Sequence, residues 1–362
     1  MEIGSEFWLD DVLTEQKREA QWVRKFGNTV LTTSGRGAIS LLLQEVNPRF
    51  KSVLLPAYIC DSVILPFQKN GYHCSFYDVN KDLSPVIETI RENREVGIFL
   101  HMGYFGFSTN SNLMEVIGEL KRSSAIIIED VTQTLFSDFK RYEENDYYIA
   151  SVRKWMGLPS GGLLASPAGE IKNTLPEDKS FAAIRKEALL LKAEYIHKKE
   201  ESLKKQYLNL FSHGERILSE EPYPYRIDSL SNNIMNGIDV NKLVKSRNNN
   251  YQRLKKGLNG IGFIEPVFKD VPENTCPMFY PVYLNNKRDQ IRERLSSQQI
   301  YCPIHWSRPE QISANNFKNA RDIYNRVLSI PCDQRYDWRD MDRIISVLGE
   351  LENDRSLIRG SE

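Results

Sequence analysis

Short runs of apolar residues recur along the first half of the chain, and each is followed by a polar or glycine-containing segment. Between them lie segments of helical character, such as Ala38–Leu43, Ser62–Lys69 and Asn112–Lys121. Short buried strands that alternate with helices predict an α/β fold with a mostly parallel central sheet covered on both faces. The expected strands are residues 29–31, 53–55, 74–77, 96–101, 125–128, 147–150 and 162–165.

The second half has a different pattern. Residues 180–218 are charged and helical with few breakers, and the prolines and polar residues between Pro222 and Asn233 predict a connection. Beyond it we expect helices at 240–258, 288–296 and 339–351 and strands at 278–284 and 301–304. For a chain of 362 residues this predicts two domains, a large α/β domain at 1–225 and a smaller α+β domain at 226–362.

Charge and cysteine usage narrow the class of protein. Lys and Arg number 48 and Asp and Glu number 48, which argues against a dedicated nucleic-acid binder. The five cysteines are scattered without a CxxC pair, so we expect neither a metal site nor a disulfide framework. No apolar run approaches the ~20 residues of a membrane span, and the first ten residues lack a signal-peptide pattern. These features predict a cytoplasmic protein with no membrane contact.

Three segments that follow predicted strands carry candidate chemistry, because ligands bind at the carboxyl ends of parallel strands. Ser34–Gly37 precedes a helix, so its backbone amides suit either an anion or a plain tight turn. Asp130 ends a strand, where a carboxylate serves as a helix cap, a metal ligand or the partner of a protonated ring nitrogen. Lys154, with Gly161-Gly162 behind it, is either a solvated lysine or a buried one that forms a Schiff base.

Taken together, these segments have the layout of a fold-type I pyridoxal-phosphate enzyme. The chain resembles the DegT/DnrJ/StrS family of pyridoxal-phosphate-dependent nucleotide-sugar aminotransferases over nearly its whole length. The matching segments are Ser34–Ile39, Val53–Ala57, Ile128–Gln133, Lys154 with Gly161-Gly162, Leu328–Pro331 and Asp340–Leu348. The resemblance implies a large domain with a mostly parallel sheet, a smaller C-terminal domain, and a homodimer with sites at the interface.

The resemblance also implies roles for individual residues. Lys154 would hold the aldehyde of pyridoxal 5′-phosphate and shuttle a proton, and Asp130 would pair with the pyridinium nitrogen. Gln133 would lie beside the cofactor 3-hydroxyl. The phosphate would be held by Ser151, by the amides of Arg36 and Gly37, and by Asn232 of the neighbouring chain.

The chain departs from the family at several positions. Arg36 replaces the usual Thr, the gap from Ser151 to Lys154 is two residues shorter, and Tyr58 is the nearest substitute for the family's aromatic stacking residue. Arg153 and Arg308 are candidates for substrate binding, because guanidinium groups grip carboxylates and phosphates. His305 is a third candidate, because the segment that carries it and Arg308 resembles the family's C-terminal substrate loop.

We therefore expect an aminotransferase that moves an amino group from glutamate to a keto sugar nucleotide, in surface-polysaccharide or related sugar biosynthesis. Three alternatives stay open: a sugar dehydratase, against which Lys154 counts, an aminotransferase for small amino acids, and a non-catalytic protein that kept the fold.

Overall fold

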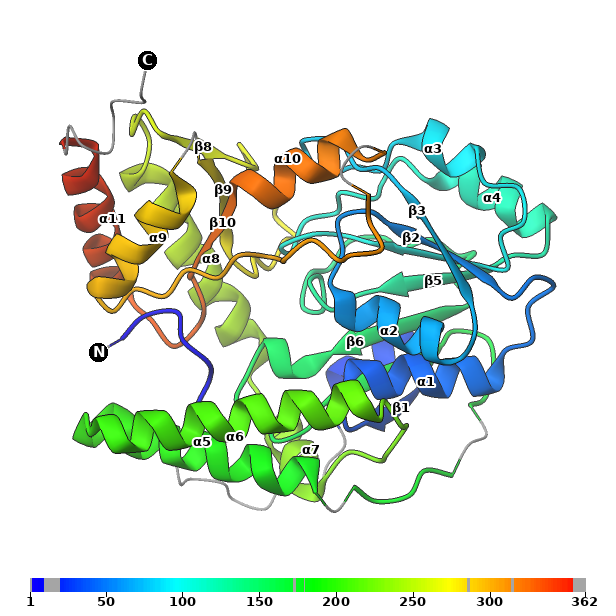
Figure 1. Ribbon diagram of the computed structural model, residues 1–362, viewed down its shortest axis with the longest axis horizontal. Coiled ribbons are helices and arrows are strands. Elements are labelled where there is room, and N and C mark those ends of the chain that lie inside the picture. The colour runs from blue at the N-terminus through cyan, green and yellow to red at the C-terminus, as the bar shows by residue number, and fades with distance from the viewer. Residues whose placement is uncertain are drawn as a thin grey trace.

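A seven-stranded sheet forms the centre of the larger part of the molecule (Figure 1). The computed structural model describes residues 2–9, 20–171, 174–178, 180–284, 287–313 and 316–353. The strands are β1 (Asn28–Thr32), β2 (Ser52–Pro56), β3 (His73–Tyr77), β4 (Ile98–Met102), β5 (Ile126–Asp130), β6 (Tyr147–Ser151) and β7 (Gly162–Ser166). Their order is β1-β7-β6-β5-β4-β2-β3. Strands β3, β2, β4, β5 and β6 run parallel, and β7 pairs antiparallel with both β6 and β1, so the prediction of a mostly parallel sheet is confirmed.

The inner strands are apolar because both of their faces are covered. Every residue of β4 and of β7 is buried, which accounts for their continuous rather than alternating apolar pattern. Helices α1 (Gly35–Glu45) and α2 (Asp61–Lys69) pack on each other and contact β6, β7 and β3. Helices α3 (Ile87–Arg91) and α4 (Met114–Arg122) also pair and contact β3 and β5.

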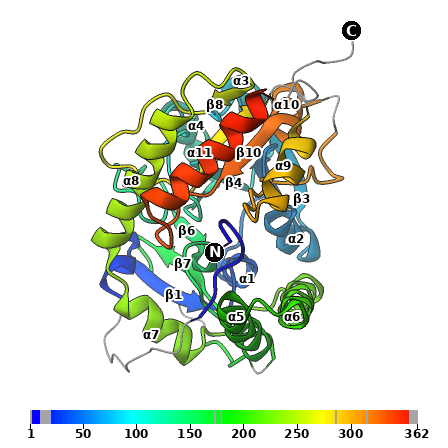
Figure 2. The same ribbon diagram turned by 90° about the vertical axis from the view of Figure 1, so that its left-hand side faces the viewer.

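A second, three-stranded antiparallel sheet lies in the C-terminal part. It consists of β8 (Ile264–Pro266), β9 (Tyr280–Leu284) and β10 (Val327–Ile330), in the order β10-β9-β8. Helices α8 (Val240–Gly257), α9 (Arg288–Ser297), α10 (Lys318–Arg326) and α11 (Trp338–Asn353) surround it (Figures 1 and 2). The expected strand at 301–304 is wrong: Pro303 has no N–H to donate, and β10 takes its place in the sheet.

Residues 180–218 form not one long helix but an antiparallel hairpin of α5 (Phe181–Lys198) and α6 (Glu201–Glu220) (Figure 1). The turn falls at Lys199, whose backbone is left-handed with φ 60°. The expected connection before residue 233 is partly wrong, since α7 (Ser229–Gly237) begins there. Asp228 caps α7 by accepting a hydrogen bond from the Ser231 amide, a start signal that the neighbouring prolines obscured.

The N-terminal residues lie against the C-terminal part of the chain. The Ile3 amide donates to the Gln299 carbonyl at 2.9 Å, and the Tyr301 amide donates to the Ile3 carbonyl at 2.7 Å. The domain boundary at residue 225 stays a prediction. Among the residues that the structure describes, none of the helices combines the length and the apolar character that crossing a membrane requires.

Candidate active site

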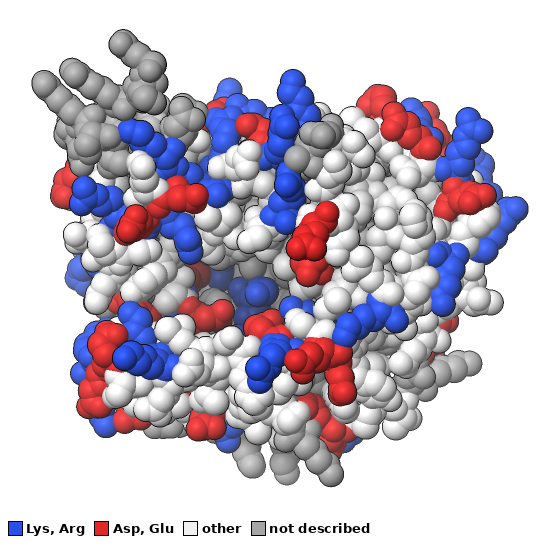
Figure 3. Space-filling model, viewed as in Figure 1, with Lys and Arg blue, Asp and Glu red and all other residues white. Residues whose placement is uncertain are grey.

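A cavity of about 200 Å³ opens at the carboxyl ends of the parallel strands. It lies where the sheet, α1, α6 and the 305–306 segment approach one another. Its lining includes Arg36, Asp130, Gln133, Ser151, Arg153, Lys154 and His305 among the predicted residues. Figure 3 shows that this face of the molecule is hollowed above the α5–α6 hairpin, with basic and acidic side chains gathered in the hollow. Seven of the ten predicted site residues therefore meet at one cavity.

The first turn of α1 forms one wall. Ser34 caps this helix, and its Oγ accepts a hydrogen bond from the Gly37 amide at 3.0 Å. The prediction that the Gly37 amide holds a phosphate is therefore wrong, because the cap already uses it and Gly37 does not line the cavity. The amides of Gly35 and Arg36 have no acceptor among the described residues and lie at the positive end of the helix dipole. They remain available for an anion.

Asp130 lies at the end of β5, on the cavity floor. It is 4% exposed, and its carboxylate accepts a hydrogen bond from the Thr132 amide at 2.8 Å. Desolvation raises the pKa of Asp130 to about 6, and the hydrogen bonds from Thr132 only partly oppose this effect. No cationic side chain of the described residues pairs with it. A buried carboxylate without a cation suits a ligand that brings a protonated nitrogen.

Lys154 ends the short helix η2 (Val152–Lys154) that follows β6. Its side chain is exposed to the open cavity, so the interpretation of Lys154 as a buried lysine is wrong, and no described residue accepts a hydrogen bond from it. Neighbouring contacts fix the backbone here: the Ser151 amide donates to Thr132 Oγ1 at 2.9 Å, and Trp155 Nε1 donates to the Thr132 carbonyl at 2.6 Å. The amine is thus held at the cavity on a rigid support and is free to react.

An unexpected carboxylate, that of Glu215 on α6, also faces the cavity. Arg36 Nη1 and Arg153 Nη1 lie 3.0 and 3.2 Å from its two oxygens, and Arg185 Nη1 lies 3.9 Å away. Burial alone would raise the pKa of Glu215, but the charges of Arg153, Lys154 and Arg36 hold it well below its usual range. The sequence marked this region only as helical, because a charged residue on an amphipathic helix carries no local sign that it faces a site.

His305 and Trp306 close the cavity from the C-terminal part. The ring of His305 shares a hydrogen bond through Nδ1 with Ser329 Oγ at 2.7 Å. Desolvation lowers the pKa of His305 to about 3, and the Lys154 charge adds to the effect, so the imidazole is neutral at pH 7. The sequence pattern gave Trp306 no role of its own in the site.

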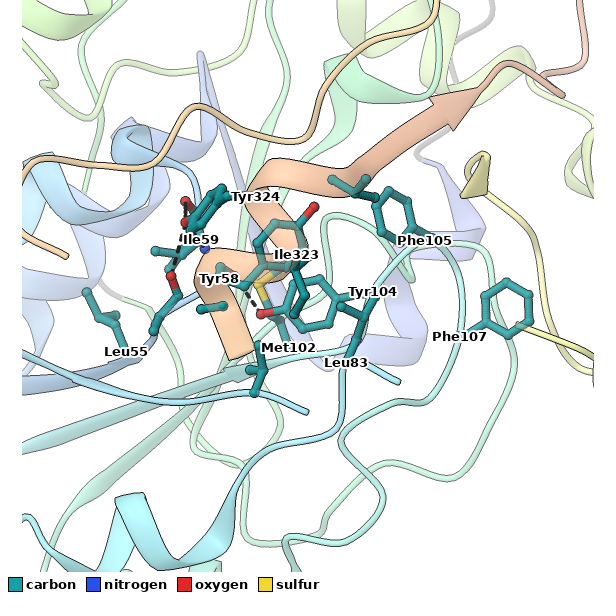
Figure 4. Close-up of a cluster of buried hydrophobic side chains, with 14 of the residues drawn as sticks. Leu55, Tyr58, Ile59, Leu83, Met102, Tyr104, Phe105, Phe107, Ile323 and Tyr324 are labelled. Atoms are coloured by element: carbon teal, nitrogen blue, oxygen red, sulfur yellow. Dashed lines mark hydrogen bonds between the residues drawn. The ribbon is translucent and has the colours of Figure 1, made fainter. Parts of the chain in front are cut away.

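Tyr58 does not line the cavity. Its ring is fully buried and packs 5.3 Å from Tyr104 and 5.0 Å from Tyr324, centroid to centroid (Figure 4). Trp306, whose ring lies 5.2 Å from that of Tyr58, is the aromatic side chain that reaches the cavity. Tyr58 therefore supports the aromatic wall rather than forming it.

Besides Gly37, two predicted residues lie outside the cavity. Arg308 is exposed on the loop between α9 and α10 and does not line the cavity. Asn232, on α7, lies in a separate groove beside β1 together with Leu31 and Arg226. Neither residue contributes to the cavity of its own chain, so a role for Asn232 requires a second chain.

The residues present fit pyridoxal 5′-phosphate. Lys154 offers an unpaired amine for the aldehyde, and Asp130 lacks the cation that a pyridinium nitrogen would supply. The amides of Gly35 and Arg36 lie where a phosphate would gain from the helix dipole. The cations Arg36, Arg153, Arg185 and Lys154 outnumber the carboxylates Glu215 and Glu6 in this cluster, so a phosphate dianion would balance its charge.

The sheet order, the smaller antiparallel sheet and the cavity at the strand ends define a fold-type I α/β protein. The model of the DegT/DnrJ/EryC1/StrS aminotransferase family matches residues 192–349. This match covers the α6 helix and most of the C-terminal part, and the fold of the whole chain agrees with it. The family resemblance inferred from the motifs is confirmed over residues 192–349.

Solved structures share the fold at low sequence identity. PseC of Helicobacter pylori, an aminotransferase involved in the biosynthesis of pseudoaminic acid, superimposes with a TM-score of 0.67 at 13% identity, over 97% of this chain and 99% of that one. The PLP form of Spr1654 from Streptococcus pneumoniae gives 0.67 at 14% identity, over 95% and 93%. The sugar aminotransferase CalS13 from Micromonospora echinospora gives 0.64 at 14% identity, over 93% of each chain. A comparison with curated proteins returned no match.

Proposed function

We propose that this protein is a pyridoxal-phosphate-dependent sugar aminotransferase that transfers an amino group from glutamate to a keto sugar nucleotide. The observation that carries the proposal is the convergence of Lys154, Asp130 and the first turn of α1 on one cavity. These three groups come from segments that lie 24 residues (Asp130 to Lys154) to 119 residues (Gly35 to Lys154) apart in the chain, and the chemistry of one cofactor accounts for all three.

The chain's own residues divide the work. Pyridoxal phosphate, when bound, supplies a ring that accepts the electron pair released at the reacting carbon. Asp130, as a carboxylate, keeps the ring nitrogen protonated, and the buried position strengthens this ion pair. Lys154 carries a proton between the two reacting carbons, since its unpaired amine can take up and release one. Ser151 and Gln133 line the same cavity and orient the ring and phosphate.

A sugar substrate is supported by the family and by the sugar aminotransferases that share the fold. The neutral His305 and the indole of Trp306 suit a hydroxylated, partly apolar sugar ring, and Arg308 is proposed to reach the more distant nucleotide phosphates. We also propose a role in surface-polysaccharide biosynthesis, a homodimer, and a cytoplasmic location. The last agrees with the five cysteines, which are all free thiols.

Spectroscopy and peptide mapping test this proposal. Purified protein incubated with pyridoxal phosphate should gain an absorbance band near ~410–430 nm, and borohydride should fix the cofactor on Lys154. Lys154→Ala should bind cofactor without becoming labelled. Labelling of another lysine would contradict the assignment, and the absence of any band would favour the non-catalytic alternative. Screening amino donors against keto sugar nucleotides and small keto acids then separates the enzyme classes.

A further inference from the structure

The cluster around Glu215 contains more cationic donors than its hydrogen bonds use. The two carboxylate oxygens bridge Arg36 and Arg153, at 3.0 and 3.2 Å, and each bond uses a single Nη1 atom. The Glu215 side chain is 43% exposed toward the cavity, whereas that of Arg153 is only 5% exposed. Glu215 thus ties two guanidinium groups together at the cavity wall and leaves their other edges free.

The free edges lack partners. The Nε atoms of both Arg36 and Arg153 are buried and have no hydrogen-bond acceptor. A buried donor left unsatisfied costs on the order of 1–3 kcal/mol, and native structures rarely leave two of them side by side. Both arginines line the cavity, so the missing acceptors are those of a ligand. A guanidinium group presents paired donors that match the oxygens of a phosphate.

The positions of Arg36 and Arg153 indicate which type of phosphate-bearing ligand they would bind. Arg36 belongs to the first turn of α1, where the Gly35 and Arg36 amides are also free, and Ser151 lines the same cavity wall. Arg153 directly precedes Lys154, the residue proposed to bind the cofactor aldehyde. A phosphate monoester tethered to a ring beside Lys154 would therefore lie within reach of both guanidinium groups.

We propose that Arg36 and Arg153 grip the phosphate of pyridoxal phosphate through their guanidinium groups, with Glu215 as the positioning residue that holds them in place. This inference rests on the proposed function. It assigns Arg153 to the cofactor instead of the substrate, and it makes the α5–α6 hairpin part of the phosphate site of its own chain. Without Glu215, the like charges of Arg36, Arg153 and Arg185 would repel one another, and the long side chains would regain rotamer freedom.

Binding of pyridoxal phosphate, pyridoxal and uridine diphosphate to the cofactor-free protein tests the proposal. Arg36→Gln and Arg153→Gln should each weaken the binding of pyridoxal phosphate roughly ten- to hundredfold, which is the loss of affinity expected for one charge-assisted hydrogen bond. Pyridoxal, which has no phosphate, should bind within about twofold of wild type. The control is Arg216→Gln on α6. Arg216 Nε lies 3.9 Å from Glu220 Oε1 and both side chains are exposed, so this variant should change the dissociation constant of neither pyridoxal phosphate nor pyridoxal.

Glu215→Gln tests the positioning role. It should weaken the binding of pyridoxal phosphate about three- to tenfold and leave the affinity for pyridoxal unchanged. Glu215→Asp should recover part of the lost affinity. A damaged fold would instead weaken both ligands and lower the midpoint of thermal unfolding. Tighter binding of pyridoxal phosphate by Glu215→Gln would overturn the positioning role, because the carboxylate would then be only a repelling charge.

The remaining outcomes separate the two proposals. Unchanged affinity for pyridoxal phosphate in both arginine variants would overturn the phosphate grip while the proposed function stands. Selective loss of uridine diphosphate binding would do the same and would assign the arginines to the substrate. Wild-type protein that binds neither pyridoxal phosphate nor pyridoxal would overturn both.

Discussion

At the scale of single residues, the site is governed by how each charge is solvated. Asp130 and Glu215 are both carboxylates at one cavity, yet their pKa values move in opposite directions. Burial without a cation raises the pKa of Asp130 to about 6, whereas three arginines and Lys154 lower that of Glu215. Asp130 has no cationic partner among the described residues and can pair with a cationic group of a ligand, whereas Glu215 is already paired with arginines. These different surroundings are what give the two acids different roles.

The raised pKa of Asp130 predicts how stability depends on pH in the cofactor-free protein. Between about pH 4 and 6 the folded state keeps a proton that the unfolded chain has released, so unfolding becomes easier as the pH rises through this window. The total loss is roughly 2–3 kcal/mol. Asn does not ionise, so Asp130→Asn should be more stable than wild type at pH 7 and nearly equal to it at pH 4.

Urea unfolding of both cofactor-free proteins at the two pH values measures this difference. Pyridoxal phosphate should reverse the order at pH 7, because only the carboxylate gains an ion pair with the ring nitrogen, and Asp130→Asn should lose most turnover. A stability difference that is the same at both pH values would show that Asp130 does not titrate in this range.

At the scale of elements, close backbone contacts place the strands and the first turn of α1 around the cavity. Gly162, the first residue of β7, packs directly against Ser34, the residue that caps α1. A Cβ atom built there would lie 2.1 Å from the Ser34 carbonyl oxygen. The second glycine of the Gly161-Gly162 pair behind Lys154 is therefore a packing requirement of the site.

Gly162→Ala should lower the free energy of unfolding by at least about 2 kcal/mol, because the two nearest atoms belong to the Ser34 backbone and cannot rotate away. It should also weaken cofactor binding, since Ser34 caps the helix that would hold the phosphate. Gly349→Ala in α11 is the control: no atom lies within 4 Å of the added methyl, and we expect a gain of up to ~1 kcal/mol. Equal stability of the two variants in urea would contradict the packing argument.

A buried ion pair attaches the α5–α6 hairpin to the N-terminal segment. Lys192 Nζ lies 3.3 Å from Glu2 Oε1, and the two side chains are 1% and 2% exposed. Lys192→Met should cost about 3–5 kcal/mol, because it leaves a buried carboxylate without its cation. The double variant Lys192→Met/Glu2→Leu should recover most of the loss.

Lys198→Met on the same helix is the matched control. Lys198 is 55% exposed and pairs with Glu194, so its removal should change the free energy of unfolding by less than about 1 kcal/mol. Thermal unfolding of the four proteins checks these values. A double variant no more stable than Lys192→Met would mean that the charge left behind is not what destabilises the single variant.

At the scale of the whole molecule, we predict that two chains share their sites. Asn232 lies beside the edge strand β1, in a groove apart from the Lys154 cavity. If it binds a phosphate, that phosphate belongs to another chain. Two-fold dimers are the commonest oligomers, and the zero net charge offers no repulsion against association.

Subunit mixing tests this prediction. Light scattering should show a dimer, and Asn232→Ala should weaken cofactor retention. Equal amounts of Lys154→Ala and Asn232→Ala chains, once exchanged, should recover up to about a quarter of wild-type activity, because half the dimers are mixed and each has one complete site. A mixture no more active than its parents would exclude Asn232 from the neighbouring site, and a monomer that retains the cofactor would exclude the shared site altogether.

The sequence by itself determined the alternation of strands and helices, the mostly parallel sheet and the positions of Lys154 and Asp130 at strand ends. These follow from local patterns, since apolar runs, caps and glycines act over a few residues. The tertiary structure alone decided which distant residues meet. In the folded chain the Gly37 amide donates to the Ser34 cap, Tyr58 is buried and Lys154 is exposed. Glu215 meets Arg153, 62 residues away in the chain, and Arg36, 179 residues away. Burial and charge pairing arise only when the elements pack, so no local pattern in the chain carries them.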